Sequence, residues 1–246
     1  MTCEVRIGTS GWEYDHWRGN FYPVDLPRDR WLEFYADRFD TVEVNASFYR
    51  LPEAGTFTRW GRRVPGEFRF AVKASRYLTH VRRLREPGEP LERLWSRAQR
   101  LNGRLGPMLY QLPPRWRPNM DRLEAFLAAI PRDRAQAVEV RDRRWYRRDV
   151  LAMLDAAGVA LVIHDMPDSR TPIRRVGPMV YLRFHGAGER YGGAYSSQSL
   201  SGWARRIAAW ADEAPVWAYF NNDIGGHAVR DADRLRRMVE RRLPSG

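Results

Sequence analysis

Two short segments of the sequence place acidic, basic and amide side chains on the face opposite their valines. In TVEVN, Glu43 and Asn45 alternate with valine, and in AVEVR, Glu139 and Arg141 do the same. Because successive side chains of a strand point to opposite faces, each polar pair shares one face of its strand. A positioned carboxylate can act as a general base, and arginine can hold an anionic group. The pattern therefore indicates acid–base chemistry on an anionic ligand.

Other β-rich segments repeat this alternation and supply further candidates. We predict catalytic roles for Glu43, Glu139 and His185, with a carboxylate as general base and the histidine as its acid or base partner. Substrate binding is predicted for a larger set, which is Asn45, Lys73, Gln111, Arg141, His164, Arg183, Tyr219 and Asn221. Lys73 is the only lysine of the chain, which indicates either a position where a planar guanidinium cannot serve or chance survival in an arginine-rich sequence.

The elements that must position these residues are eight β-rich segments, most of them separated by helical patterns. The β-rich segments are residues 5–9, 41–45, 69–73, 108–112, 137–141, 160–165, 180–185 and 216–222. Apolar residues at helical spacing predict helices over residues 28–39, 91–101, 120–130, 150–157, 200–210 and 232–239. Strands that alternate with helices indicate parallel βα units, and eight such units indicate a closed barrel.

We therefore predict an α/β fold in which residues 1–246 form a single TIM-type (β/α)8 barrel domain. The length of the chain matches the usual size of that fold. The sixth crossover is expected to lack a regular helix, because residues 166–178 contain three prolines and no apolar periodicity. An open doubly wound sheet is the alternative, but no glycine-rich phosphate turn follows an early strand.

A barrel would direct the polar candidates inward, because the valine faces of the strands meet the surrounding helices. Each candidate would lie toward the carboxyl end of its strand, where barrel enzymes place their active sites. Among them, the three cations Lys73, Arg141 and Arg183 outnumber the carboxylates Glu43 and Glu139, which suits an anion such as phosphate. The alternative is a self-satisfied network of ion pairs that only fills the barrel.

Composition favours anionic partners and disfavours several other classes of protein. The formal net charge is +12, which fits binding of an anionic small molecule or of nucleic acid, although scattered arginines also fit solvated helix faces. One cysteine, no apolar run of membrane-spanning length and no signal-peptide pattern predict a cytoplasmic protein without membrane association. The oligomeric state stays open.

Other chemistries find little support in the spacing of the candidate residues. The histidines lack a metal-binding spacing such as H-E-x-x-H, so we predict no metal and no cofactor. Glu43 and Glu139 belong to the second and fifth β-rich segments, which is too far apart for a glycosidase pair. No nucleophile-elbow sequence supports a serine triad. Lys73 is the one candidate for a Schiff base.

Several motifs together resemble the YecE-like family, also called domain of unknown function 72. They are GTSGW (8–12), VEVNASFYRLP (42–52), FAVKAS (70–75), LTH (78–80), YQLPP (110–114), VEVRDRRW (138–145), YLRFHG (181–186) and YFNND (219–223). The resemblance covers nearly the whole chain and implies a TIM-barrel fold, but it implies no activity. The family is likened to barrel nucleases of the endonuclease IV type at the level of fold.

Three functional hypotheses follow. The leading one is an enzyme of hydrolase or lyase type that acts on an anionic, phosphate-bearing substrate at the carboxyl end of the barrel. The second is a non-catalytic nucleic-acid-binding module, indicated by the net charge and by the aromatic residues of the first loop. The third is a barrel whose polar interior is structural and which works through a partner protein.

Overall fold

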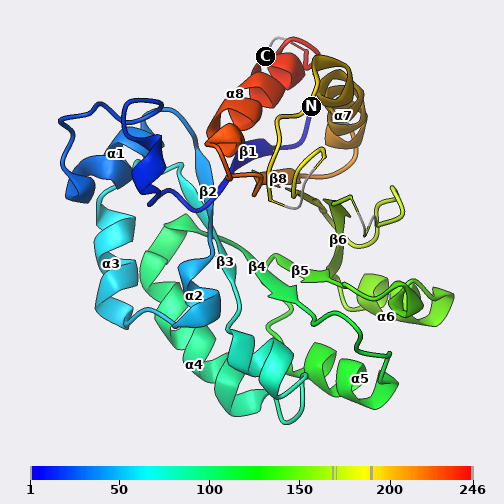
Figure 1. Cartoon of the computed structure of the whole chain (residues 1–246). Helices are drawn as coiled ribbons and strands as arrows, with labels where there is room; N and C mark the ends of the chain where they lie inside the picture. The colour runs from blue at the N-terminus through cyan, green and yellow to red at the C-terminus, as the bar shows by residue number, and fades with distance from the viewer. Residues whose placement is uncertain (1, 168, 170, 189–190, 245–246) are drawn as a thin grey trace. The chain divides into compact units, whose positions relative to one another are not determined.

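Eight parallel strands form a closed barrel in the order β1 to β8 in the computed structural model, which describes residues 2–167, 169, 171–188 and 191–244 (Figure 1). The strands are β1 (Val5–Ser10), β2 (Thr41–Val44), β3 (Arg69–Lys73), β4 (Leu105–Gln111), β5 (Gln136–Glu139), β6 (Ala160–Asp165), β7 (Val180–Phe184) and β8 (Val216–Phe220). Each coincides with a predicted β-rich segment to within a few residues. The predicted (β/α)8 barrel is therefore confirmed.

Helices follow most of the strands. They are α1 (Trp31–Ala36), α2 (Ala46–Tyr49), α3 (Ala54–Arg62), α4 (Gly88–Ala98), α5 (Met120–Ala129), α6 (Arg148–Ala156), α7 (Ser197–Ala211) and α8 (His227–Glu240). The amphipathic patterns decide which faces are buried, as in α4, where Leu91, Leu94 and Trp95 are buried. Helix α3 was not predicted, since its sequence AGTFTRWGR contains two glycines, which disfavour helix interiors.

The sixth crossover lacks a helix in the described part of residues 166–179, as the three prolines predict. The predicted segment includes Asp168 and Arg170, which lie outside the described residues. Its second half is fixed by hydrogen bonds, from Leu161 N to Val176 O (3.3 Å) and from Gly177 N to Asp155 Oδ1 (2.9 Å). Gly177 has a φ of +82°, and a Cβ atom there would lie 2.6 Å from the Val159 carbonyl oxygen, so only glycine fits.

Two compact units divide the chain. Unit 1 comprises Met1–Glu43, Ile163–Thr171 and Met179–Gly246, and unit 2 comprises Val44–Val162 and Pro172–Pro178, in each case as far as these residues are described. The boundaries fall inside β2 and β6. Each unit is described by itself below. The prediction that residues 1–246 form one domain stays a prediction.

Three aromatic residues of the first loop, Trp12, Trp17 and Tyr22, belong to the core of unit 1. The side chains of Trp17 and Tyr22 are buried, and the Tyr22 ring stacks on that of Trp31 with centroids 4.5 Å apart. Trp17 Nε1 donates a hydrogen bond to Asp223 Oδ1 (2.7 Å), which joins the first loop to the segment after β8. These two rings therefore stabilise the fold, and their faces are not available to stack on a nucleic-acid base.

Candidate functional site

All the predicted site residues lie close to the carboxyl end of a strand. Seven of them are the last or second-last residue of a strand, namely Glu43, Lys73, Gln111, Glu139, His164, Arg183 and Tyr219. The other four follow a strand by one or two residues, namely Asn45, Arg141, His185 and Asn221. In a TIM barrel this end carries the active site. Unit 1 holds Glu43, His164, Arg183, His185, Tyr219 and Asn221, whereas unit 2 holds Asn45, Lys73, Gln111, Glu139 and Arg141.

Glu43 is the centre of a buried network in unit 1. Arg183 donates to both carboxylate oxygens, from Nε to Oε2 (3.0 Å) and from Nη2 to Oε1 (2.7 Å). Tyr181 OH donates to Oε2 (2.7 Å), and Ser10 Oγ donates to Oε1. A carboxylate offers about four acceptor positions, so these four hydrogen bonds use the capacity of Glu43. The side chains of Glu43 and Arg183 are both fully buried.

The strand order explains how these side chains meet. Ser10 on β1 is the register partner of Glu43 on β2, which makes them neighbours on one face of the sheet. Arg183 and Tyr181 come from β7, and β1 and β8 separate β7 from β2 in the closed order. Side chains of β2 and β7 can therefore meet only across the interior. The predicted inward direction of Glu43 and Arg183 agrees with these contacts.

Two tyrosines support the network as neutral groups. Tyr181 and Tyr219 are buried, with ring centroids 5.3 Å apart, and the Tyr219 hydroxyl lies 2.7 Å from Thr41 Oγ1. Burial and the charge of Glu43 raise the pKa of Tyr181 well above its ordinary value. Burial also raises the pKa of Tyr219. Both phenols are therefore protonated, and Tyr181 remains a donor to Glu43.

The unit 1 histidines lie beside this network. His185 is buried, with Nε2 3.5 Å from Arg183 Nη1 and Nδ1 3.3 Å from Asn221 Nδ2. His164 has its two ring nitrogens within 3.0 Å of Thr171 Oγ1 and Ser169 Oγ. The two imidazole centroids are 6.3 Å apart. The structure thus brings together Glu43, Arg183, His185 and Asn221, while the catalytic role of His185 stays a prediction.

A second carboxylate–arginine pair lies in unit 2. Glu139 Oε1 forms an ion pair with Arg141 Nε, and Gln111 Nε2 donates to Glu139 Oε2 (2.9 Å). Gln111 and Glu139 are register partners on the parallel strands β4 and β5. Both members of the ion pair are largely buried. Three of the predicted residues therefore form one cluster at the carboxyl ends of β4 and β5.

Lys73 lies at the end of β3, where α2 packs against it. Ser47 Oγ in α2 donates to the carbonyl oxygen of Lys73 (2.6 Å). The Lys73 ammonium group lies 4.2 Å from the centroid of the Phe48 ring, a distance at which a cation and an aromatic face attract each other. Helix α2 therefore fixes both the backbone and the charged group of Lys73.

The pKa of His80 depends on the charges of this cluster. It belongs to a π-helical turn (Tyr77–Val81), and its ring meets the Phe48 ring edge-on with centroids 5.0 Å apart. Burial lowers the pKa of His80 to about 4, helped by the positive charges of Lys73, Arg76 and Arg141 and opposed by Glu139. The charges of Lys73, Arg76 and Arg141 therefore act together with burial to disfavour protonation of His80.

Several residues that build these clusters are not among the catalytic and substrate-binding residues predicted from the sequence. Ser10 and Tyr181 complete the shell of Glu43, and Phe48, Arg76 and His80 complete that of Lys73. The signal for His80 was its position in LTH soon after β3, together with the π-helical turn that often marks functional sites. The signal for Ser10 was its place in the last position of β1.

Two findings concern metals and membranes. Within the described residues, no group of three or more His, Cys, Asp or Glu side chains is arranged to hold a metal ion. No helix in the described ranges combines the length and the apolar character that a membrane span requires.

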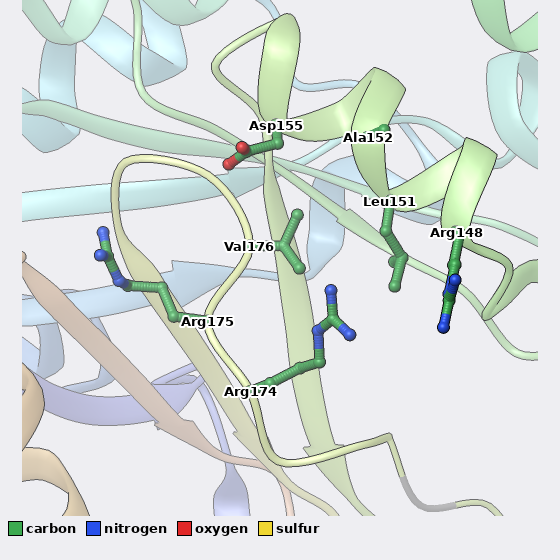
Figure 2. A pocket seen from close by; sticks show the side chains of 7 residues that line it. All are labelled: Arg148, Leu151, Ala152, Asp155, Arg174, Arg175 and Val176. Atoms are coloured by element: carbon green, nitrogen blue, oxygen red, sulfur yellow. The ribbon is translucent and has the colours of Figure 1, made fainter.

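A cavity of about 320 Å³ lies in unit 2 between α6 and the second half of the sixth crossover. It is lined by Arg148, Leu151, Ala152, Asp155, Arg174, Arg175 and Val176 (Figure 2). Figure 2 shows the guanidinium groups of Arg148 and Arg174 near the Leu151 side chain, whereas that of Arg175 extends in another direction. This second cationic site contains none of the predicted residues and provides a control for experiments on the first.

The closed parallel barrel with polar side chains at the carboxyl ends of its strands defines a protein of the TIM-barrel class. The chain belongs to the family described as "Protein of unknown function DUF72", which matches residues 6–245. It is similar to the UPF0759 protein YunF of Bacillus subtilis, with 26% identity over 96% of this chain and 94% of that protein. It is also similar to the UPF0759 protein YecE of Escherichia coli K12, with 30% identity over 58% of this chain and 51% of YecE. The predicted family membership is therefore confirmed.

Solved structures agree with this assignment. A DUF72 family protein from Thermotoga maritima has a TM-score of 0.85 and 28% identity, covering 96% of this chain and 99% of that one. A DUF72 family protein from Enterococcus faecalis has a TM-score of 0.80 and 22% identity, covering 98% and 97%. D-psicose 3-epimerase in the presence of D-fructose has a TM-score of 0.57 and 11% identity, covering 96% and 97%, which shows a shared fold alone.

Proposed function

We propose that the chain is an enzyme of hydrolase or lyase type that acts on an anionic, phosphate-bearing small molecule at the carboxyl ends of the unit 2 strands. The observation that carries the proposal is the grouping of polar side chains at the carboxyl ends of the unit 2 strands, where Glu139 pairs with Arg141 and accepts a hydrogen bond from Gln111, and where the Lys73 ammonium group lies against the Phe48 ring. The lowered pKa of His80, to which the charges of Lys73, Arg76 and Arg141 contribute, supports it. Such cations suit a phosphate group, because charge-assisted hydrogen bonds from arginine and lysine are among the strongest in proteins.

Separate roles are assigned to the residues of this cluster. Lys73 and Arg141 hold the phosphate group of the substrate. Glu139 is the general base, since Gln111 and Arg141 orient its carboxylate. His80 is neutral at pH 7 because its pKa is about 4, and it can give or accept a hydrogen bond beside the anion without adding charge. Positioned acid–base groups contribute typically about 10²- to 10⁴-fold to the rate.

Glu43 and Arg183 receive a structural role in this proposal. Their bidentate ion pair, completed by Ser10 and Tyr181, supports a function in fixing the interior of unit 1. Arg183 would have to give up hydrogen bonds to both oxygens of Glu43 before it could hold a substrate. The Lys73 ammonium group, which lies 4.2 Å from the centroid of the Phe48 ring, therefore has the main anion-binding role, and Arg141 supports it from its ion pair with Glu139.

Calorimetric titration with inorganic phosphate and pyrophosphate at low salt tests the binding part of the proposal. Lys73→Met is expected to weaken binding roughly 10- to 150-fold, because a hydrogen bond to a charged group contributes about 1.5–3 kcal/mol. Arg76→Gln is expected to weaken it less, since Arg76 is exposed. Unchanged binding by the Lys73 variant, with an unchanged melting temperature, would refute the site.

The matched control is Arg174→Gln, which removes one positive charge at the cavity shown in Figure 2. It is expected to bind phosphate like the parent protein. If instead this variant loses the affinity and Lys73→Met keeps it, the anion site belongs to the cavity beside α6 and the proposal is wrong. For catalysis, Glu139→Gln is expected to keep the phosphate affinity but to lose turnover of whichever phosphoester the parent protein converts.

A further inference from the structure

A groove opens directly beside the cationic cluster. A cavity of about 350 Å³ in unit 2 is lined by α2, by the turn after β3 and by α4, and Phe48 and Ser75 are among its lining residues. Phe48 is also the ring under the Lys73 ammonium group and against the His80 imidazole. Phe48 is therefore the residue that connects the cavity to Lys73 and His80, and the volume of the cavity is within the range of small-molecule sites.

Two exposed tyrosines line this groove. Tyr49 is 82% exposed and Tyr77 is 51% exposed, although large aromatic side chains are usually covered. Tyr49 packs edge-on against Phe48, with ring centroids 5.2 Å apart. The Tyr77 hydroxyl accepts a hydrogen bond from Arg82 Nη1 (3.5 Å), which restrains the ring. Exposed rings that neighbouring side chains hold in place are suited to stack on a planar ligand.

Three arginines and two carboxylates, those of Glu53 and Glu89, line the groove. Arg50 and Arg93 line the cavity and are exposed, whereas Arg97 is engaged with Glu53 (3.1 Å) and with backbone carbonyl oxygens. Arginine side chains stack on planar π-systems and pair with phosphate. Arg83, Leu84 and Glu86, which follow the π-helical turn, have positive φ angles. Backbone strain of this kind clusters at ligand sites.

We propose that the substrate is a nucleotide, whose phosphate lies on Lys73 and whose base stacks on Tyr49 and Tyr77 in the groove. This inference rests on the proposed function, since it extends the same site. Stacking uses the π-face that every base has, so the groove accepts different bases and prefers the larger purines. The nucleotide can be free or part of a single strand, because both present a phosphate next to a base.

Affinities for inorganic phosphate, ribose 5-phosphate and adenosine 5′-monophosphate, measured by calorimetry, test the inference. The nucleotide is expected to bind roughly 5- to 150-fold more tightly than ribose 5-phosphate, the range that stacking of one base provides. The double variant Tyr49→Ala/Tyr77→Ala is expected to lose this advantage and to bind inorganic phosphate as before. The matched control is Val24→Ala, which truncates another exposed apolar side chain (72% exposed) in unit 1.

The outcomes separate this inference from the proposed function. If phosphate binds through Lys73 but the nucleotide binds no more tightly than ribose 5-phosphate, the inference is wrong and the phosphate site stands. The same holds if the tyrosine variant keeps the advantage of the nucleotide. If neither phosphate nor the nucleotide binds, both fail. An oligonucleotide of six residues that binds more tightly than the mononucleotide, with a steep salt dependence, assigns the groove to a single strand.

Discussion

The two carboxylate–arginine pairs of this barrel protein use the same chemistry but differ in what surrounds them. In unit 1, Glu43 accepts four hydrogen bonds from Arg183, Tyr181 and Ser10, and the pair is completely buried. In unit 2, Glu139 is paired with Arg141 and accepts a hydrogen bond from Gln111, and the charges of Lys73, Arg76 and Arg141 all help to lower the pKa of His80. We therefore assign a structural role to the pair whose four acceptor positions are all used, and a ligand-binding role to the pair whose arginine acts on His80 together with two further cations.

The largest effect that distinguishes the two pairs is expected on stability. Glu43→Ala leaves the Arg183 guanidinium buried without its partner, and breaking a buried pair in this way costs about 3–5 kcal/mol. Urea unfolding monitored by tryptophan fluorescence measures this loss. The double variant Glu43→Leu/Arg183→Met removes both charges and is expected to be more stable than Glu43→Ala. A single variant at least as stable as the double one would contradict the structural role of the pair.

The sequence predicts most of the fold and the location of both pairs. The alternation in TVEVN and AVEVR is sufficient to place Glu43 and Glu139 on the face opposite the valines. In a closed barrel the valine face meets the helices, so the opposite face points into the interior. The ends of the strands could be predicted approximately, because polar residues interrupt each apolar run of the sequence. The absence of a helix from the described residues of the sixth crossover followed from its prolines, which cannot continue a helix.

The partners of these residues could not be predicted, and the reason is geometric. The stagger of the strands determines which side chains meet across the interior of a barrel. No local pattern of the sequence contains information about this stagger. Glu43 therefore had several possible cations, and only the contacts of β2 with β7 select Arg183. His80 is not among the predicted site residues, because it lies in a turn after β3, where neither the helix period nor the strand period applies.

A smaller effect is expected at the neutral donor of the Glu43 network. Tyr181→Phe removes the hydroxyl that donates to Glu43 Oε2 (2.7 Å) and is expected to cost about 1.5–3 kcal/mol, as for other hydrogen bonds to charged groups. Tyr195→Phe is the matched control. Its hydroxyl accepts a bond of 3.3 Å from Gly186 N, a neutral donor, so the expected cost is about 0.5–1.5 kcal/mol. Equal losses in the two variants, measured by urea unfolding, would contradict the charge-assisted network.

The last effect concerns the unit 2 cluster and depends on pH. The pKa of His80 is about 4 in the folded protein and near its ordinary value of 6.5 in the unfolded chain, so the unfolded chain takes up a proton first as the pH falls. The contribution of neutral His80 to stability is therefore fully present above pH 6.5 and is lost as the pH falls from 6.5 to 4. His80→Gln is expected to show a stability that changes less with pH over this interval, measured by thermal unfolding of both proteins.

Lys73→Met is expected to raise the pKa of His80 toward its ordinary value, which NMR titration of the imidazole measures. Two results would contradict this: a dependence of stability on pH that is the same in His80→Gln as in the parent protein, or a pKa of His80 that does not change in Lys73→Met. Either result would mean that solvent screens the cations near His80. The electrostatic difference between the Glu43–Arg183 and Glu139–Arg141 pairs would then be smaller than their geometry indicates.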